Sequence, residues 1–274
     1  MTDALVSTSW VAERLDEPGT RVIEVSITRL QAYDGGHLPG AVAIDWQGEL
    51  IEREDESSGI VIDPERFAAL ARRLGLRPED TLVFYGDAGG RHAARAFWTF
   101  EYYRHSGPLH LMDGGREAWE REGRPLTAEA PAAAALEPSD YAAPLGPDES
   151  LRATREELAA RLGEDGFTVL DTRTRGEYEG TDVRSARGGH MPGAAHVFWE
   201  EAVAADGSFR PRAELAALYG RLAREGTIAA HCQLGVRSVH TWFVLRHILG
   251  YPNVKNYDGS WQEWGNRQDT AIER

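Results

Sequence analysis

The chain has 274 residues, enough for two domains of ordinary size, and 42% of them are apolar, which excludes a disordered chain. Its formal net charge of -14 at pH 7 lacks the basic footprint that nucleic-acid binding requires. The single cysteine, Cys232, excludes an intramolecular disulfide and every metal or redox motif built on two cysteines.

The N-terminal stretch 1–15 has neither the basic nor the apolar region of a secretory signal. No apolar run in the sequence is long enough to span a membrane. We therefore expect a soluble protein of the reducing cytoplasm, with neither a membrane nor a nucleic acid as its partner.

The first half of the chain alternates predicted strands and helices. The apolar run at 21–25 predicts a strand, and the motif GGHLPGAVAIDW follows it at 35–46. Residues 64–75 predict a helix, and 81–86 predict a second strand. This alternation favours an α/β domain in which helices cover both faces of a parallel sheet.

The stretch 127–150 is rich in alanine and proline and has no sustained amphipathic period, which predicts a linker. The domains would then comprise residues 1–126 and 151–274. Tyr141 and Leu145 offer apolar side chains with which the linker would pack along the second domain.

The second half repeats the plan of the first. A strand is predicted at 167–172, GGHMPGAAHVFW follows at 188–199, and a helix at 212–223 precedes a strand at 227–232. The motif YDGSWQEW, close to the C-terminal end of the sequence, also echoes MDGGREAW in the first half. The chain is therefore predicted to contain two copies of one domain.

Cys232 stands where the last predicted strand passes into a helix. Apolar positions from Ser238 onward fit a buried helix, which Gly250 would end. A thiol at a helix N-terminus meets unpaired N–H groups that favour the thiolate, and Gly235 lets the loop curl. A lone cysteine is more often a small buried hydrophobe, but this position favours a nucleophile.

These motifs resemble those of the tandem-domain rhodanese family of thiosulfate and 3-mercaptopyruvate sulfurtransferases. The N-terminal signature, an aromatic residue, three residues of any kind and then His-aliphatic-Pro-Gly-Ala, is met at 33–41, and the C-terminal signature at 256–264. The resemblance implies two rhodanese-like domains, each a parallel five-stranded sheet flanked by helices. It also implies an active site in the second domain and an inactive first domain, where Gly86 aligns with Cys232.

The resemblance implies that Cys232 is the catalytic nucleophile, which takes sulfane sulfur from thiosulfate as a persulfide and passes it to cyanide or another thiophile. No metal and no organic cofactor is required. The active-site loop would consist of Gln233, Leu234, Gly235, Val236, Arg237 and Ser238. Arg237 would bind the substrate anion and lower the pKa of the thiol, or would instead pair with a carboxylate such as Asp171 or Glu177.

Three arginines precede His190 and are possible substrate-binding residues: Arg173, Arg175 and Arg184. Arg184 matches a substrate-side arginine of the family by its spacing before that histidine, whereas the other two fit a solvated surface equally well. His37 and His190 recur in both halves. Since one half has no nucleophile, a structural role in the turn is expected for both histidines.

Three alternative functions share part of this pattern, and each differs from it at a particular position. A 3-mercaptopyruvate sulfurtransferase typically has an arginine where this chain has Glu177, and a carboxylate there would repel a keto acid. The best-known thiosulfate loop, however, has Arg and Lys where Gln233 and Leu234 stand. A phosphatase or arsenate reductase would need arginine in place of Ser238. A non-catalytic rhodanese module that recognises a partner protein usually lacks the cysteine altogether.

Overall fold

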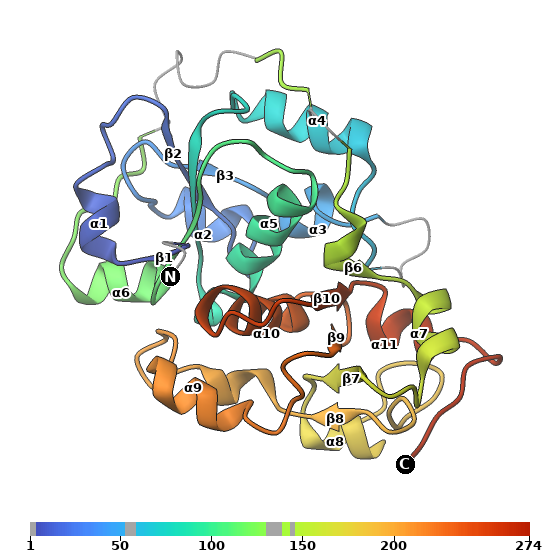
Figure 1. The fold of residues 1–274 in the computed structure, drawn as a ribbon. Coiled ribbons are helices and arrows are strands. Elements are labelled where there is room, and N and C mark those ends of the chain that lie inside the picture. The colour runs from blue at the N-terminus through green and yellow to red at the C-terminus, as the bar shows by residue number, and fades with distance from the viewer. Residues whose placement is uncertain (1–3, 53–58, 130–138, 143–145) are drawn as a thin grey trace. The chain divides into compact units, whose positions relative to one another are not determined.

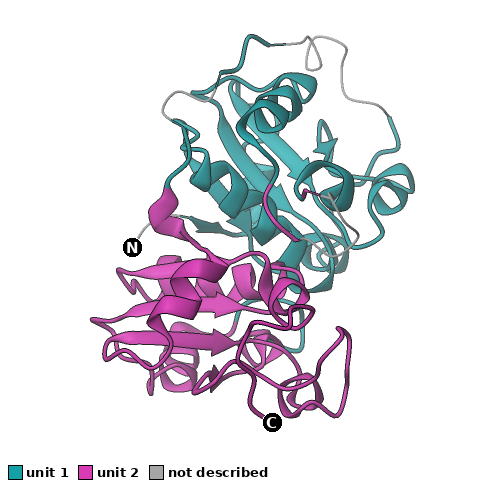
Figure 2. Cartoon of the chain, turned by 90° about the vertical axis from the view of Figure 1, so that its right-hand side faces the viewer, with its two compact units in different colours: residues 1–51, 62–148, 204–209 teal, residues 52–61, 149–203, 210–274 magenta. Residues whose placement is uncertain are grey.

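A computed structural model describes residues 4–52, 59–129, 139–142 and 146–274. The chain forms two compact units, which Figure 2 shows in different colours. The first unit consists of residues 1–51, 62–148 and 204–209, and the second of residues 52–61, 149–203 and 210–274. Each unit thus includes a short segment from the other half of the sequence.

The first unit contains a five-stranded parallel sheet in the order β1-β5-β4-β2-β3 (Figure 1). Its strands are β1 (Leu5–Val6), β2 (Thr20–Glu24), β3 (Val42–Ala43), β4 (Thr81–Tyr85) and β5 (Leu109–Met112). Its helices are α1 (Thr8–Ala12), α2 (Leu30–Asp34), α3 (Trp46–Glu49), α4 (Pro64–Arg73), the 3-10 turn η1 (Ala88–Gly90), α5 (Arg91–Tyr102) and α6 (Gly115–Arg121). The strands and the helix predicted in this half correspond to β2, β4 and α4.

Local chemistry explains where α4 begins and ends. The carboxylate of Asp63 accepts hydrogen bonds from the amides of Glu65 and Arg66, and Pro64 occupies the first turn, where its missing N–H is not needed. Arg72 and Arg73 lie in the last turn, where positive charge complements the helix dipole.

The second unit contains a sheet of the same order, β6-β10-β9-β7-β8, and all of its strand pairs are parallel. Its strands are β6 (Arg152–Ala153), β7 (Phe167–Asp171), β8 (Ala195–His196), β9 (Thr227–His231) and β10 (Val254–Tyr257). Its helices are η3 (Glu149–Leu151), α7 (Arg155–Arg161), α8 (Arg175–Glu179), η4 (Trp199–Ala202), α9 (Arg212–Leu218), α10 (Arg237–Phe243), its π-helical continuation η5 (Val244–Ile248) and α11 (Ser260–Trp264). The predicted fold, two parallel five-stranded sheets flanked by helices, is confirmed.

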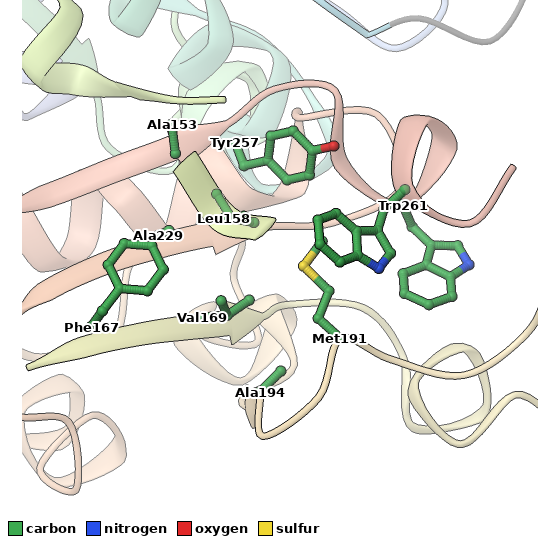
Figure 3. Packing of buried hydrophobic residues seen from close by; sticks show 10 residues of the cluster. Ala153, Leu158, Phe167, Val169, Met191, Ala194, Ala229, Tyr257 and Trp261 are labelled. Atoms are coloured by element: carbon green, nitrogen blue, oxygen red, sulfur yellow. The ribbon is translucent and has the colours of Figure 1, made fainter. Parts of the chain in front are cut away.

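Strand alternation separates the two faces of the second sheet. Phe167 and Val169 of β7 point to one face, where they form a core cluster with Tyr257, with Leu158 of α7 and with Trp261 of α11 (Figure 3). The helix α10 packs against β9 and β10 on the other face. Both faces are therefore buried, as parallel sheets require.

The end of the predicted linker packs differently from the expectation. Tyr141 is buried in the first unit, where its hydroxyl lies 2.9 Å from Nδ1 of His105 and its carbonyl accepts a hydrogen bond from Arg72 at 3.1 Å. The prediction that Tyr141 packs along the second domain is therefore wrong, because its ring packs edge-on against Phe67 of the first unit. Leu145 lies outside the described residues. Throughout the described ranges, no helix is both long enough and apolar enough to cross a membrane.

Gly86 follows β4 directly, and its backbone is enclosed on two sides. A Cβ on Gly86 would lie 2.1 Å from the carbonyl oxygen of Val25, and a Cβ on Gly115 would lie 2.2 Å from the oxygen of Gly86. Only glycine fits such a close approach of three backbone segments.

We predict that Gly86→Ala lowers the free energy of unfolding by about 2 kcal/mol, because the added methyl forces β2 and β4 apart. Gly35→Ala is the matched control, since Gly35 has a φ of -70° and a Cβ there would lie 3.5 Å from its nearest neighbours. Its effect should stay within roughly 0.5 kcal/mol. Chemical denaturation followed by tryptophan fluorescence measures both variants, and equal stabilities would contradict the packing described.

Candidate active site

The only cysteine lies where the central strand β9 ends. β9 stops at His231, and Cys232 opens a loop that runs to the start of α10. The neighbouring strand β7 fixes this strand end, since the amide of Thr172 donates to the carbonyl of His231 at 3.0 Å. Gly235 has a φ of +67°, which glycine adopts without steric cost. The thiol is thereby held at the carboxyl end of the sheet with 1% of its residue surface exposed.

The start of α11 holds the loop from one side. The amide of Trp261 donates to the carbonyl of Cys232 at 3.0 Å, and the amide of Gln262 donates to the carbonyl of Gln233 at 3.0 Å. The side chain of Gln233 donates to Oε1 of Gln262 at 2.6 Å and to Oγ of Ser185 at 3.1 Å. Gln233 therefore faces α11 and is fixed by the protein itself.

Several donors surround the sulfur of Cys232. Oγ of Ser238 lies 3.6 Å from it, and the same oxygen lies 2.7 Å from Oδ1 of Asn256. Burial raises the pKa of the Cys232 thiol, but the charge of Arg237 and hydrogen bonds from Ser238 and from the amide of Leu234 lower it by more. The pKa therefore lies below its ordinary value, which favours the thiolate.

The cation that lowers this pKa is held by a buried carboxylate. Nη1 and Nη2 of Arg237 donate to the two oxygens of Glu177 at 2.7 and 2.8 Å. Glu177 is 1% exposed and also closes the capping box of α8, accepting from the amide and hydroxyl of Thr174. Burial raises the pKa of Glu177, but Arg237 and Thr174 bring it down to about 2. Arg237 thus pairs with Glu177, and its charge lowers the pKa of the thiol, while its binding of a substrate anion stays a prediction.

Arg173 lies beneath the loop. Its guanidinium binds both carboxylate oxygens of Asp171 and the carbonyl of Gly189, and it stacks 4.2 Å from the centre of the Trp261 ring. It is 1% exposed. We infer a structural role for Arg173, because its donors are committed to this interior network and not to solvent.

The other two predicted arginines lie in different places. Arg175 has 71% of its side chain exposed and faces Glu179 at 3.6 Å. Arg184 is half exposed, bound to Asp182 at 2.9 Å and 3.7 Å from Glu177. Of the three, only Arg184 lies beside the pair formed by Arg237 and Glu177.

Two histidines recur with the same contacts in both units. Nδ1 of His37 lies 3.0 Å from the carbonyl of Tyr33, and the two rings stack at 3.8 Å. Nδ1 of His190 lies 2.9 Å from the carbonyl of Tyr178, and their rings stack at 3.7 Å. This matched geometry fits a structural role for both histidines at the turn before β3 and β8.

The strand end in the first unit carries no nucleophile. Gly86 follows β4 as Cys232 follows β9, and the amide of Arg116 donates to its carbonyl at 2.8 Å, as Trp261 does to that of Cys232. Two residues further on, the amide of Ala88 donates to Oε1 of Glu117 at 2.9 Å. In this unit the amide of Ala88 therefore already has the carboxylate of Glu117 as its acceptor.

Two further residues contact the loop that the sequence alone did not point to. Oγ of Ser260 accepts hydrogen bonds from the amides of Cys232 and Gly235, and Asn256 contacts Ser238. Both belong to the C-terminal signature at 256–264, which marked the stretch as important without indicating which side chains face the loop.

Residues 7–122 and 154–267 each match the family model of the rhodanese-like domain. The chain is 43% identical to the sulfur carrier protein TtuD of Thermus thermophilus, over 96% of this chain and 94% of that protein. It is 42% identical to the thiosulfate sulfurtransferase of Corynebacterium glutamicum, over 99% of this chain and 90% of that protein.

Solved structures give the same answer for the fold. The structure of the 3-mercaptopyruvate sulfotransferase SseA from Escherichia coli superposes with a TM-score of 0.82 at 26% identity, covering 95% of this chain and 99% of that one. Fold and site together define a tandem α/β protein with a buried thiol in a strand-end loop. The chain belongs to the rhodanese family, with two rhodanese-like domains, which confirms the resemblance drawn from its motifs.

We predict that Arg237→Gln raises the apparent pKa of Cys232 by roughly one unit, because the thiolate loses the cation whose charge lowers that pKa. The pH dependence of thiol alkylation by iodoacetamide measures this pKa. The double variant Arg237→Gln/Glu177→Gln avoids a buried, unpaired carboxylate and should show the same shift in a more stable fold. Arg175→Gln, which removes an exposed arginine, should leave the profile unchanged. A profile unchanged in the double variant would show that Arg237 does not act on the thiol.

Proposed function

We propose that this chain is a sulfurtransferase that moves sulfane sulfur from thiosulfate to a thiophile through a persulfide on Cys232. The observation that carries the proposal is the buried Cys232 thiol, whose pKa is lowered by Arg237 and by donors of its own loop. The chain has no second cysteine with which a persulfide could form an internal disulfide. The outer sulfur would therefore leave only to an external acceptor.

In the first half of the cycle the thiolate of Cys232 attacks the outer sulfur of thiosulfate. A new S–S bond forms, and the original S–S bond breaks as sulfite leaves with its electron pair. The persulfide carries the same single negative charge as the thiolate. The amides of Leu234 and Ser238 face the sulfur of Cys232 and would stabilise the thiolate, a role like that of an oxyanion hole.

In the second half a thiophile attacks the outer sulfur of the persulfide. The bond between the two sulfurs breaks, and its electron pair returns to Cys232 as the thiolate. With cyanide the product is thiocyanate, and with a cellular thiol it is a new persulfide. The name of the Thermus relative, a sulfur carrier protein, favours a cellular acceptor over cyanide. A reducing compartment such as the cytoplasm suits a thiol that must be free again in each cycle.

The second candidate donor is 3-mercaptopyruvate, because the Escherichia coli structure belongs to such an enzyme. A keto acid needs an oriented clamp for its carboxylate. In this chain Glu177 stands at the position of the expected clamp, and two donors of Arg237 already bind it. A compact dianion needs only local donors, so these contacts favour thiosulfate.

We predict that treatment with thiosulfate adds the mass of one sulfur to Cys232, as seen by mass spectrometry of the intact protein and its peptides. Cys232→Ser should add none and should lose at least about 1000-fold in turnover, since a hydroxyl is a poor nucleophile toward sulfur. Its near-isosteric side chain should preserve the fold. Sulfur uptake elsewhere in the chain, or turnover by the serine variant, would contradict the assignment.

We further predict a higher kcat/KM for thiosulfate than for 3-mercaptopyruvate when both are assayed with the same acceptor. Arg184→Gln should raise KM for thiosulfate severalfold with little change in kcat, because Arg184 would attract the substrate without touching the reacting sulfur. Arg175→Gln serves as the control for loss of a surface charge. A preference for 3-mercaptopyruvate would overturn the choice of donor and leave the sulfurtransferase function intact.

A further inference from the structure

Ser260, the first residue of α11, is placed where the loop of Cys232 turns. Its Oγ accepts hydrogen bonds from the amide of Cys232 at 3.1 Å and from the amide of Gly235 at 3.0 Å. The same hydroxyl donates to the carbonyl of Tyr257 at 2.8 Å. A hydroxyl has one donor and two acceptor positions, so all three are used.

The backbone of Ser260 is in an unusual conformation. Its φ is +52°, in the left-handed region that L-residues other than glycine, asparagine and aspartate seldom adopt. The residue is fully buried, so solvent does not relieve this strain. A non-glycine residue persists in such a conformation only where the surrounding structure holds it there, and for Ser260 the three hydrogen bonds of its hydroxyl do so.

The first unit provides the natural comparison. Gly115, also the first residue of its helix, has a φ of +53° and lies against Gly86 as Ser260 lies against Cys232. A Cβ on Gly115 would lie 2.2 Å from the Gly86 oxygen, so only glycine fits there. The strained serine therefore occurs in the unit that has the cysteine, and glycine in the unit that lacks it.

The amides of the two loops are used differently. In the first unit the amide of Ala88 binds the carboxylate of Glu117. The matching amide in the second unit is that of Leu234, and it faces the sulfur of Cys232. Gln262, which matches Glu117, is turned toward Gln233 instead.

We propose that Ser260 is a positioning residue that ties the amides of Cys232 and Gly235 to one oxygen and so curves the loop until the amide of Leu234 faces the sulfur. Residues 232 and 235 are three apart, and two bonds to a single atom close the chain between them into a ring. Without the hydroxyl, two buried amides lose their acceptor and turn toward another one. The loop would then lose the curvature that brings the amide of Leu234 toward the sulfur. This inference rests on the proposed role of Cys232.

The test compares Ser260→Ala and Ser260→Gly by the pH profile of thiol alkylation and by the kinetics of sulfur transfer. Ser260→Gly removes the hydroxyl and also relieves the positive φ, so its fold should lose less stability than that of Ser260→Ala. Ser260→Ala removes the hydroxyl and keeps the strain. We expect both variants to alkylate roughly five- to tenfold more slowly near neutral pH, because the thiolate loses a positioned donor. We expect kcat/KM for thiosulfate to fall roughly 10- to 100-fold in both.

Ser26→Ala is the matched control, since Ser26 is a buried serine of the first unit whose hydroxyl binds Glu24 at 2.9 Å. Its alkylation profile should equal that of the parent. A parental alkylation profile in Ser260→Gly would overturn the proposal, as would loss of the fold in both Ser260 variants, which would mark a purely structural residue. The pH profile of alkylation reports the acidity of the Cys232 thiol itself and does not depend on which sulfur donor the protein uses. A parent protein that gains no sulfur from thiosulfate would therefore refute the proposed function and leave the Ser260 result readable.

Discussion

The bidentate pair between Arg237 and Glu177 is the interaction on which the site depends. A thiolate buried to 1% exposure has lost its hydration, and burial alone would keep it protonated. A fixed cation offsets that cost only if it is itself held in place. Glu177 does this through two bonds of 2.7 and 2.8 Å, and it in turn is anchored by the capping box of α8. The lowered pKa of the Cys232 thiol thus depends, through Arg237 and Glu177, on the capping box at the start of α8.

The two units share one fold but differ in the chemistry at the end of the central strand. Both have the same strand order, the same stacked tyrosine–histidine turn and a glycine or cysteine directly after the central strand. In the first unit the space after that strand is closed by backbone, since added atoms on Gly86 or Gly115 would meet carbonyl oxygens near 2 Å. In the second, a side chain fits at both positions, and the amides of Leu234 and Ser238 face the sulfur. The unit without the nucleophile is therefore also the one whose backbone packs more tightly after the central strand.

Much of this was readable from the sequence, because it depends on local patterns. Repeated motifs and strand–helix alternation predicted two parallel sheets, and the position of Cys232 after a strand predicted its loop. The contact of Arg173 with the carbonyl of Gly189 and the two bonds to Ser260 join residues 16 and 25 to 28 positions apart, and for Arg237 the sequence named Glu177 only as one of two candidate partners. Such pairings are set by packing in three dimensions. Tyr141 was misplaced for the same reason, since an apolar side chain in a linker does not reveal which domain has room for it.

The charges around Cys232 also explain what kind of anion the loop can hold. Arg237, Arg173 and Arg184 are each paired with a carboxylate: Glu177, Asp171 and Asp182. Most of the positive charge near Cys232 is therefore compensated, and under the proposed function the oriented amides of Leu234 and Ser238 would contribute most to holding an anion at the sulfur. Such donors act over short distances and suit a single sulfur atom better than an extended carboxylate. In the proposed cycle the negative charge moves from Sγ of Cys232 to the outer sulfur of the persulfide, a distance of about 2 Å, so the loop would have to present donors to both positions.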